Sequence, residues 1–280
     1  MSSERITAVI VVYNKKVSES ITCQMVKDIE PAMDIFIIDN SEIETGNAEY
    51  CKKNGIRYMS MDGNKGLSKA YNRAVDNSLS SDVIILFDDD TEITSEYFEK
   101  LRIALDEHPE IDIFAPVVRG QDGVIYSPNE FNFLKNNLVM SSTQTVSRER
   151  FNAIASCLAI RIRVFDNYRF NEKLFVDQVD QFFFCEQRCR RKTFGVLDVE
   201  ILQHFYQRSA TLTPEAGWNR LKLRIVDLFR HARLMGGNRY TMLAFIKSCG
   251  LGVQIGKKTR SIRVMFKAGL LSCKLIFIDL

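Results

Sequence analysis

The sequence predicts an α/β protein, a mostly parallel sheet flanked by helices, followed by a basic helical extension. Along the first 120 residues, short apolar β-branched runs alternate with stretches whose apolar residues recur at helical spacing. Repeated β-α-β units of this kind form parallel strands covered by helices on both faces. The charge then changes sign: residues 1–213 hold 25 bases and 32 acids, whereas residues 214–280 hold 13 bases and three acids.

The individual elements follow from local patterns. Apolar runs predict strands at 6–12, 34–38, 56–59 and 83–87, with a further run at 111–118. Helical spacing predicts helices at 17–29, 47–54, 67–79 and 95–107. Pro31 lies just past the first helix and Gly55 closes the second. Polar residues follow several strands, and ligands of open α/β sheets bind beyond the carboxyl ends of the strands.

Composition excludes several classes of protein. The chain has 280 residues, 46% hydrophobic and 26% charged, which excludes a wholly disordered or fibrous chain. The seven cysteines are odd in number and form no CxxC pair, so neither a disulfide framework nor a zinc ribbon is supported. No run of 18 apolar residues occurs, and the opening segment is interpreted as a strand rather than a signal peptide. A reduced, cytoplasmic protein is the expectation.

Three consecutive carboxylates, Asp88, Asp89 and Asp90, follow the strand at 83–87. Such a cluster repels itself unless a cation is bound. Hard divalent cations such as Mg²⁺ or Mn²⁺ prefer carboxylate oxygens and keep open positions for phosphate. An acidic helix N-cap needs only one Asp, so the three together favour a cation site.

Three further segments carry polar groups of interest. Asp39 follows a strand and can accept a hydrogen bond from a base or a ribose, although Asp-Asn-Ser is also good turn chemistry. The segment 64–72 turns at Gly66 and opens a helix whose amides can face a phosphate, without dinucleotide or P-loop spacing. Asp177 and Asp180 are candidates for a general base. His204 is a candidate metal ligand, although a lone strand histidine is more often structural.

In combination these segments resemble family 2 glycosyltransferases of the GT-A fold. They occur in family order over about residues 5–205: Val11–Asn14, Ile38–Ser41, Asn64–Asn72, Phe87–Asp90 and Phe175–Asp180 with His204. The blocks NKGLSKAYNRAV and FVDQVD resemble the bacterial rhamnosyltransferase-like branch, which works on lipopolysaccharide or capsule.

The resemblance implies a role for each matching position. Contacts to the nucleotide-sugar are implied for nine residues: Tyr13, Asn14, Asp39, Asn64, Lys65, Gly66, Asn72, Asp88 and Asp89. Among these, Asp39 would bind the base or ribose, and Asp88 the ribose or sugar. Asp90 would hold the Mn²⁺ or Mg²⁺ that bridges the diphosphate, and His204 falls where many members carry a histidine near it.

The resemblance also implies an inverting mechanism with a single base. Asp180 falls at the position of that base, but the family's acid two residues later is Phe182 here, so a shifted alignment keeps Asp177 as an alternative. Ala155–Ser156 lie where the family often has Ser-Gly before the acceptor site, and Cys157 replaces a small residue.

The expected organisation is a catalytic domain, 1–213, and a basic amphipathic extension, 214–280. Basic amphipathic helices lie on anionic membranes, so the extension is expected on the cytoplasmic face of the inner membrane, where a lipid-linked acceptor is within reach. The alternative is that these helices pack on the catalytic domain.

The predicted function is transfer of a sugar from a UDP- or dTDP-sugar to a glycan or polyprenyl-linked acceptor in bacterial surface polysaccharide synthesis. The rival is an inactive nucleotide-sugar-binding or scaffold protein of the same fold. Nucleic acid is not an expected partner, because the sequence lacks the known binding motifs and the body is acidic. A homo-oligomer is compatible with the sequence, which does not specify the donor sugar.

Overall fold

The computed structural model describes residues 4–139, 141, 145–203 and 212–278. The helices are α1 Ile21–Ile29, α2 Asn47–Lys53, α3 Leu67–Asp76, α4 Ser95–Glu107, α5 Val179–Cys189, α6 Pro214–Met235, α7 Asn238–Lys258 and α8 Ile262–Phe277. The strands are β1 Ile6–Val12, β2 Asp34–Asp39, β3 Arg57–Ser60, β4 Val83–Phe87, β5 Thr91–Glu92, β6 Ile113–Gly120, β7 Ile125–Ser127, β8 Asn129–Glu130, β9 Asn137–Leu138, β10 Phe151–Asn152, β11 Leu158–Arg161 and β12 Phe194–Gln203.

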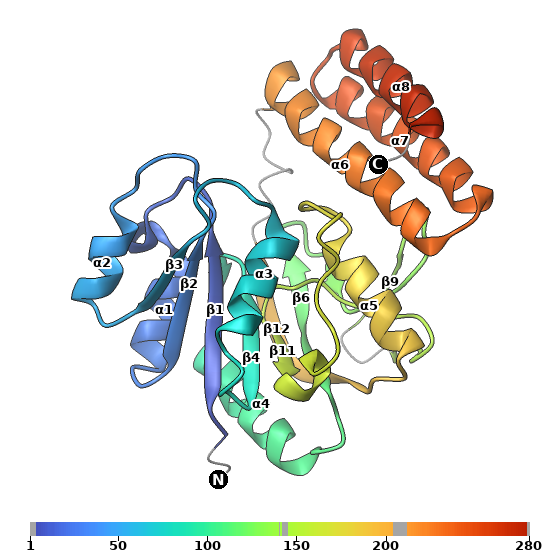
Figure 1. Cartoon of the computed structure of the whole chain (residues 1–280). Helices are drawn as coiled ribbons and strands as arrows, with labels where there is room; N and C mark the ends of the chain where they lie inside the picture. Colours follow the sequence, from blue (N-terminus) through green and yellow to red (C-terminus); the bar gives the residue numbers. More distant parts are fainter. Residues whose placement is uncertain (1–3, 140, 142–144, 204–211, 279–280) are drawn as a thin grey trace.

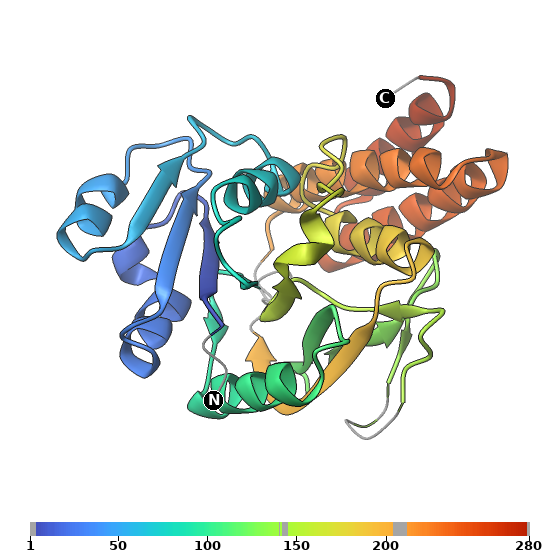
Figure 2. The same cartoon turned by 60° about the horizontal axis from the view of Figure 1, so that its bottom comes forward.

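The central sheet has the order β3-β2-β1-β4-β11-β6-β12-β5. Strands β3, β2, β1 and β4 run parallel, as do β6 and β12, whereas β11 runs antiparallel to both of its neighbours. Helices α1 and α4 cover one face of the sheet, and their Val26 and Leu101 lie in the core on that face. Helices α3 and α5 cover the other face, where Ala74 and Phe183 are buried. Figures 1 and 2 show these two helical layers on either side of the sheet. The predicted α/β class is confirmed.

The predicted elements match closely, with one helix divided. The expected helix at 17–29 is a 3-10 turn, Val17–Glu19, followed by α1. The break falls at Ser20, whose Oγ accepts a hydrogen bond from the amide of Cys23 and so caps α1. The hydroxyl of Ser20 also donates to the carbonyl of Asp89, which ties the start of α1 to the acidic segment.

The C-terminal helices form a bundle with its own core, in which residues of α6, α7 and α8 pack with Phe133 of the α/β part of the chain. Leu221, Ile225 and Phe229 of α6 are buried there, so these side chains do not face a membrane. A Cβ at Gly252 of α7 would collide with Ala268 of α8, so a residue without a side chain allows the two helices to approach closely. None of the helices in the described residues is long and apolar enough to cross a membrane.

Helix α6 docks on the α/β part of the chain through a buried carboxylate. Asp227 is fully buried and accepts hydrogen bonds from the backbone N–H groups of Phe175, Val176 and Asp177, at 2.7–3.0 Å. Arg230 of the same helix lies 3.3 Å from the Asp227 carboxylate. A buried carboxylate is tolerated only when its charge is met by such donors. This contact therefore fixes the backbone of residues 175–177, which lead into α5.

We expect Asp227→Asn to destabilise the protein by about 3 kcal/mol, because an amide places its own N–H₂ against backbone donors that need an acceptor. Urea denaturation followed by circular dichroism measures this change. Glu215→Gln, an exposed acid in the first turn of the same helix, is the matched control and should cost less than about 1 kcal/mol. Equal effects of the two substitutions would contradict the docking role of Asp227.

Candidate active site

The predicted site residues gather at the carboxyl edge of the parallel strands. Asp39 ends β2, and Asp88 follows β4 directly. The two strands flank β1, whose end leads into Tyr13 and Asn14. Parallel strands present their carboxyl ends at one edge of a sheet, so these segments meet there.

Asp39 is buried at this edge and accepts several hydrogen bonds. One of its oxygens accepts hydrogen bonds from Asn47 at 2.8 Å, Tyr58 at 3.2 Å and Thr45 at 3.3 Å, and the other accepts from the amide of Ser41 at 3.0 Å. Four donors of the chain itself thus surround the carboxylate, which holds the loop after β2 in place. The expected contact of Asp39 with a base or ribose stays a prediction.

The segments after β1 and β2 are joined to each other. Asn14, with a φ of 50°, donates its backbone N–H to Ser41 Oγ at 2.8 Å and accepts the Glu42 amide at 2.9 Å. The hydroxyl of Tyr13 donates to Glu42 at 2.8 Å, and about half of the Tyr13 side chain is exposed. An exposed aromatic side chain beside the strand ends suits stacking against a nucleoside.

The segment before α3 continues this network and requires a glycine. Asn40 donates to Asn64 Oδ1 at 3.1 Å and accepts the Lys65 amide at 2.8 Å. Gly66 has a φ of 89°, and a Cβ there would lie 2.7 Å from the carbonyl oxygen of Phe175. Only glycine fits this backbone conformation at this approach, so the 64–66 turn lies against the same 175–177 segment that Asp227 holds.

Asn72 has a structural position in α3. Its side-chain N–H₂ donates to the carbonyl of Phe170 at 2.9 Å and to Glu172 at 3.1 Å, and its oxygen accepts the Phe170 amide at 2.8 Å. Both ends of the amide are therefore used in holding α3 to residues 170–172. The predicted nucleotide contact of Asn72 stays a prediction, and the amide already has a partner on each side.

A short turn brings two carboxylates together. Ser156 Oγ donates to Asp88 Oδ2 at 2.5 Å, and the amide of Ala155 donates to Asp180 Oδ2 at 3.2 Å. Cys157 follows with a φ of 60°, a left-handed conformation that non-glycine residues rarely adopt. Its carbonyl accepts the Tyr97 hydroxyl at 2.8 Å, which holds the turn in place. A φ of 60° favours glycine, which agrees with the small residue that the sequence resemblance implied for this position.

Burial, together with neighbouring negative charges, raises the pKa of both carboxyls towards neutral pH. Burial raises the pKa of Asp180 to about 7, with a further contribution from the charge of Asp88, while the Ala155 amide opposes the rise. Burial also raises the pKa of Asp88 to about 6, although the hydrogen bond from Ser156 lowers it. A carboxyl with a pKa near 7 is matched to general-base chemistry at neutral pH.

Asp177 lies in a different environment, on the side facing α6. Its carboxylate forms an ion pair with Arg220, and Arg224 Nε lies 3.9 Å from its other oxygen. Two guanidinium groups therefore occupy the oxygens that would receive a proton. The geometry favours Asp180 over Asp177 as the base.

Asp89 and Asp90 are separated by their partners. Lys15 Nζ lies 3.3 Å from Asp89 Oδ1, so the charge of Asp89 is compensated within the chain. Asp90 accepts a hydrogen bond from Gln203 at 3.0 Å, at the end of β12. His204 lies outside the described residues.

The carboxylates of Asp88 and Asp90 suit a divalent cation whose remaining ligands are phosphates and water. The described residues contain no group of three or more His, Cys, Asp or Glu side chains that would hold a metal ion by themselves. Asp88 and Asp90 lie close enough for the charge of Asp90 to raise the pKa of Asp88, and bound Mg²⁺ or Mn²⁺ relieves such repulsion. Carboxylates supply one or two ligands in sites of this kind, and phosphates and water supply the rest.

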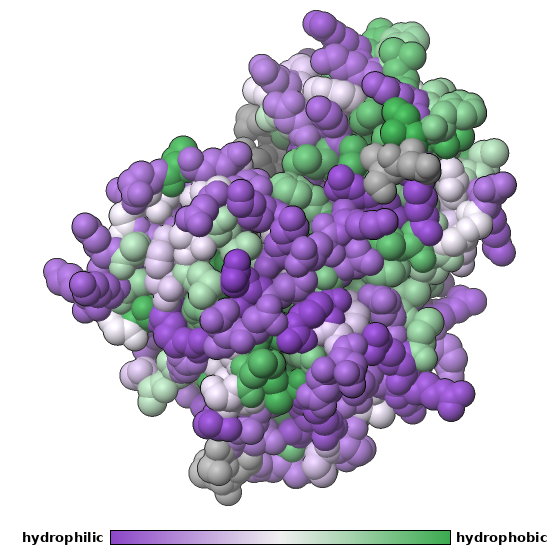
Figure 3. Space-filling model, viewed as in Figure 1, coloured by the Kyte–Doolittle hydropathy of each residue, from purple (hydrophilic) through white to green (hydrophobic). Residues whose placement is uncertain are grey.

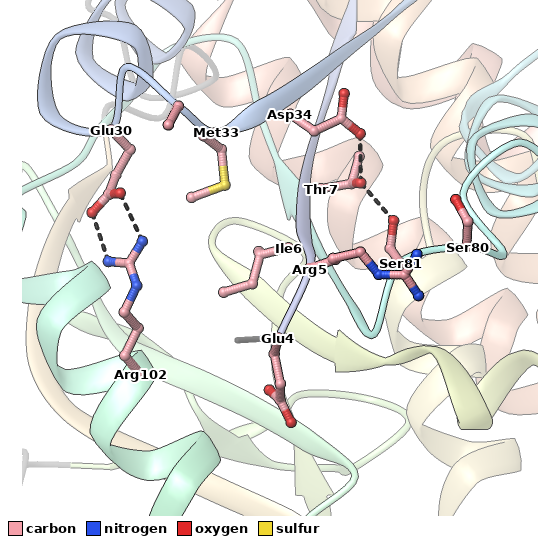
Figure 4. Close-up of a pocket in the computed structure, with 11 residues that line it drawn as sticks. Glu4, Arg5, Ile6, Thr7, Glu30, Met33, Asp34, Ser80, Ser81 and Arg102 are labelled. Atoms are coloured by element: carbon pink, nitrogen blue, oxygen red, sulfur yellow. Dashed lines mark hydrogen bonds and ion pairs between the residues drawn. The ribbon is translucent and has the colours of Figure 1, made fainter. Parts of the chain in front are cut away.

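A hollow of about 350 Å³ lies at the opposite edge of the sheet, at the amino ends of β1 and β2. Figure 4 shows Glu30 paired with Arg102 on one side and Thr7 joining Asp34 to Ser81 on the other. These polar groups are paired with one another and lie far from the acidic segment, so we do not assign a function to the hollow.

Sequence reasoning missed several residues of the site. Gln203 donates a hydrogen bond to Asp90. Asp227 accepts hydrogen bonds from the 175–177 segment. Neither residue lies in a motif that the sequence analysis singled out. Asp227 carries a signal in hindsight, since it is a lone acid between Val226 and Leu228 in a basic amphipathic helix. Tyr71 was missed as well. Its fully buried hydroxyl has no hydrogen-bond partner among the described residues, and the charges of Asp88 and Asp180 add to burial in raising its pKa.

Residues 7–169 match the family model described as glycosyl transferase family 2, and the chain belongs to this family. The fold is GT-A. No curated protein sequence matches the chain.

Solved structures with the same fold are numerous and distant. TarS 1–349 of S. aureus with UDP-GlcNAc is 13% identical, with a TM-score of 0.52 over 97% of this chain and 89% of that one. This chain spans only 54% of the longer TarS structure. Glucosyl-3-phosphoglycerate synthase of Mycobacterium tuberculosis, with Mn²⁺, UDP and phosphoglyceric acid, is 12% identical, with a TM-score of 0.54 over 81% and 78%. GalNAc-T7 with UDP, GalNAc and Mn²⁺ is 13% identical, with a TM-score of 0.56 over 92% and 55%. Identities this low show the shared fold alone.

We expect Tyr71→Phe to leave the protein as stable or more stable by about 1 kcal/mol, because it removes a buried hydroxyl without a partner. Turnover should nevertheless fall at least about tenfold, since an unpaired donor near two carboxylates is retained for a group that arrives with the substrates. Thermal unfolding and nucleotide release from a sugar donor measure the two effects. Full activity of the variant would assign Tyr71 to packing alone.

Proposed function

We propose that this chain is a metal-dependent inverting glycosyltransferase. It moves a hexosyl or rhamnosyl group from a UDP- or dTDP-sugar to a hydroxyl of a glycan or polyprenyl-linked acceptor. The process served is bacterial surface polysaccharide synthesis. The observation that carries the proposal is Asp180, a buried carboxyl with a pKa near 7, hydrogen-bonded to Ala155 at the carboxyl edge of the sheet.

The reaction is a single displacement. The Asp180 carboxylate accepts the proton of the acceptor hydroxyl as its oxygen attacks the anomeric carbon of the donor sugar. A bond forms from that oxygen to the anomeric carbon, the bond to the diphosphate oxygen breaks, and the nucleoside diphosphate leaves with the electron pair. Attack opposite the leaving group inverts the configuration at the anomeric carbon. Asp88, which accepts a hydrogen bond from Ser156, would also accept one from a hydroxyl of the donor.

A divalent cation at Asp90, with Asp88 nearby, would neutralise the negative charge that develops on the departing diphosphate. Two structures with the same fold support a uridine nucleotide as donor and Mn²⁺ as the cation for this chain. TarS was solved with UDP-GlcNAc, and the mycobacterial synthase was solved with Mn²⁺ and UDP. Tyr13 and Asn14 would line the nucleoside, beside Asp39, with the 64–66 turn next to them.

The alternative function is a protein of the same fold that binds a nucleotide-sugar without turning it over. A scaffold protein has no need for a buried, partly protonated carboxyl, which lowers the stability of the fold. Asp88, Asp90 and Asp180 are all present, which favours the enzyme. Release of nucleotide from a panel of UDP- and dTDP-sugars, with water as acceptor, separates the two functions.

The pKa of Asp180 predicts the pH dependence of this reaction. Because the carboxylate is the active form and its pKa is about 7, kcat/KM should rise with pH up to about pH 7 and then level off. Asp180→Asn should lower kcat about a hundredfold or more while donor binding is retained. Asp177→Asn is the matched control and should keep the rise with pH. A pH limb that disappears in Asp177→Asn but persists in Asp180→Asn would reverse the assignment.

Stability checks the same substitution independently of activity. The folded state raises the pKa of Asp180 from its ordinary value of about 4 to about 7, so the fold loses stability as the pH rises from about 4 to about 7 and the loss then levels off. Asp180→Asn should therefore have a higher Tm than the unsubstituted chain at about pH 8 and a similar Tm at about pH 4. A lower Tm at both pH values would mean that the loss of turnover reflects misfolding.

The metal assignment predicts a change in nucleotide binding. In the unsubstituted chain, UDP with MnCl₂ should raise the Tm more than UDP alone, because a ligand that binds only the folded state stabilises it. Asp90→Asn should abolish the added effect of Mn²⁺. Asp89→Asn should preserve it, since Asp89 is paired with Lys15. An undiminished Mn²⁺ effect in Asp90→Asn would remove Asp90 from the metal site.

A further inference from the structure

The bundle exposes an apolar stripe along α8. Ile262, Phe266, Leu270 and Phe277 are spaced at 4, 4 and 7 residues, which places them on one side of the helix. Their exposed fractions lie between 68% and 87%. The opposite side of α8, with Val264, Ala268, Ser272 and Leu275, is buried in the bundle. The stripe is thus the outward side of a helix that is already packed.

Helix α7 adds a second stripe on the same face. Met242, Ile246 and Val253 are between 44% and 59% exposed and share one side of α7. Helices α7 and α8 form an antiparallel hairpin in which Gly252 lies against Ala268, and helical spacing then directs both stripes away from α6. Figure 1 shows α6 on the side of the bundle towards α5, and Figure 3 shows hydrophobic residues gathered over the C-terminal helices.

The charge around these stripes has a single sign. From Asn238 to Ile278 the sequence has eight Lys and Arg residues and no Asp or Glu. Arg263 and Lys274 are exposed and lie along one flank of the α8 stripe. Lys267, on the same flank, instead covers the ring of Trp218 at 5.2 Å. An outward apolar ridge with a basic flank is the pattern of helices that lie in the plane of a membrane surface.

We propose that this α7–α8 face, defined by the two stripes and their basic flank, binds the surface of an anionic lipid bilayer. A second copy of the chain is disfavoured as the occupant, because it would bring two basic faces together. The apolar side chains would enter the boundary between headgroups and acyl chains while the basic residues meet lipid phosphates. Helix α6, on the other side of the bundle, joins this face to the catalytic domain through Asp227.

Flotation of the full-length protein with vesicles tests this proposal without any assay of turnover. Binding is expected to vesicles of phosphatidylglycerol and phosphatidylcholine, and much less to phosphatidylcholine alone. High NaCl should weaken it by screening the charges. Phe266→Ser with Leu270→Ser should lower the partition coefficient at least about tenfold, and Arg263→Gln with Lys274→Gln about thirtyfold at low salt.

Matched controls come from the catalytic domain. Leu79→Ser with Ile103→Ser changes two exposed apolar residues of similar size, and Lys52→Gln with Lys53→Gln removes two exposed charges. Both pairs should bind vesicles like the unsubstituted chain. Equal binding to both kinds of vesicle, or unchanged binding of the α8 variants, would overturn the proposal. So would a dimer in sedimentation velocity that Phe266→Ser with Leu270→Ser converts to a monomer.

Discussion

The arrangement of the site depends on one buried carboxylate outside the catalytic fold. Asp227 of α6 receives three consecutive backbone N–H groups from Phe175–Asp177, and His231, one turn later, lies 3.1 Å from the Gln178 side chain. Gln178 has a φ of 65° and occupies the N-cap position of α5, whose second residue is Asp180. The contacts of α6 therefore define the backbone from which the candidate base projects. The helical extension is therefore part of the architecture of the candidate active site.

Residues 175–177 also contact the 64–66 turn, on the side of the candidate site where the nucleotide-sugar is expected. The carbonyl of Phe175 accepts the amide of Leu67 at 2.5 Å, directly after the glycine turn at Gly66. The 64–66 turn, the 175–177 segment and α6 thus form one continuous set of contacts. A shift of α6 would therefore move both the 64–66 turn and the backbone that carries Asp180. A bundle bound to a bilayer through α7 and α8 would hold this set in a fixed orientation towards lipid-linked acceptors.

Much of the fold followed from local sequence patterns, because buried parallel strands and amphipathic helices leave periodic signals. The acidic segment after β4 and Asp180 could be named as candidates for the same reason, since they follow recognisable elements. Three features could not be predicted. The contact of Asp227 with residue 175 joins positions that no local pattern relates, and the choice between Asp177 and Asp180 depends on arginines of α6. The apolar residues of α6 and α8 look alike in sequence, yet α6 buries Leu221, Ile225 and Phe229 in the core that contains Phe133, whereas α8 exposes Ile262, Phe266 and Leu270. Which side of a basic amphipathic helix meets the protein is decided by tertiary packing.

The central claim is that the fold holds Asp180 as a buried base beside Asp88. Carboxyl ¹³C NMR of the full-length protein, with Asp180 assigned by comparison with Asp180→Asn, measures its titration directly and without substrates. A buried base beside Asp88 should titrate with a midpoint near pH 7. A midpoint near the ordinary value for aspartate, about 4, would contradict it, because the carboxyl would then be solvated and not set apart for proton transfer.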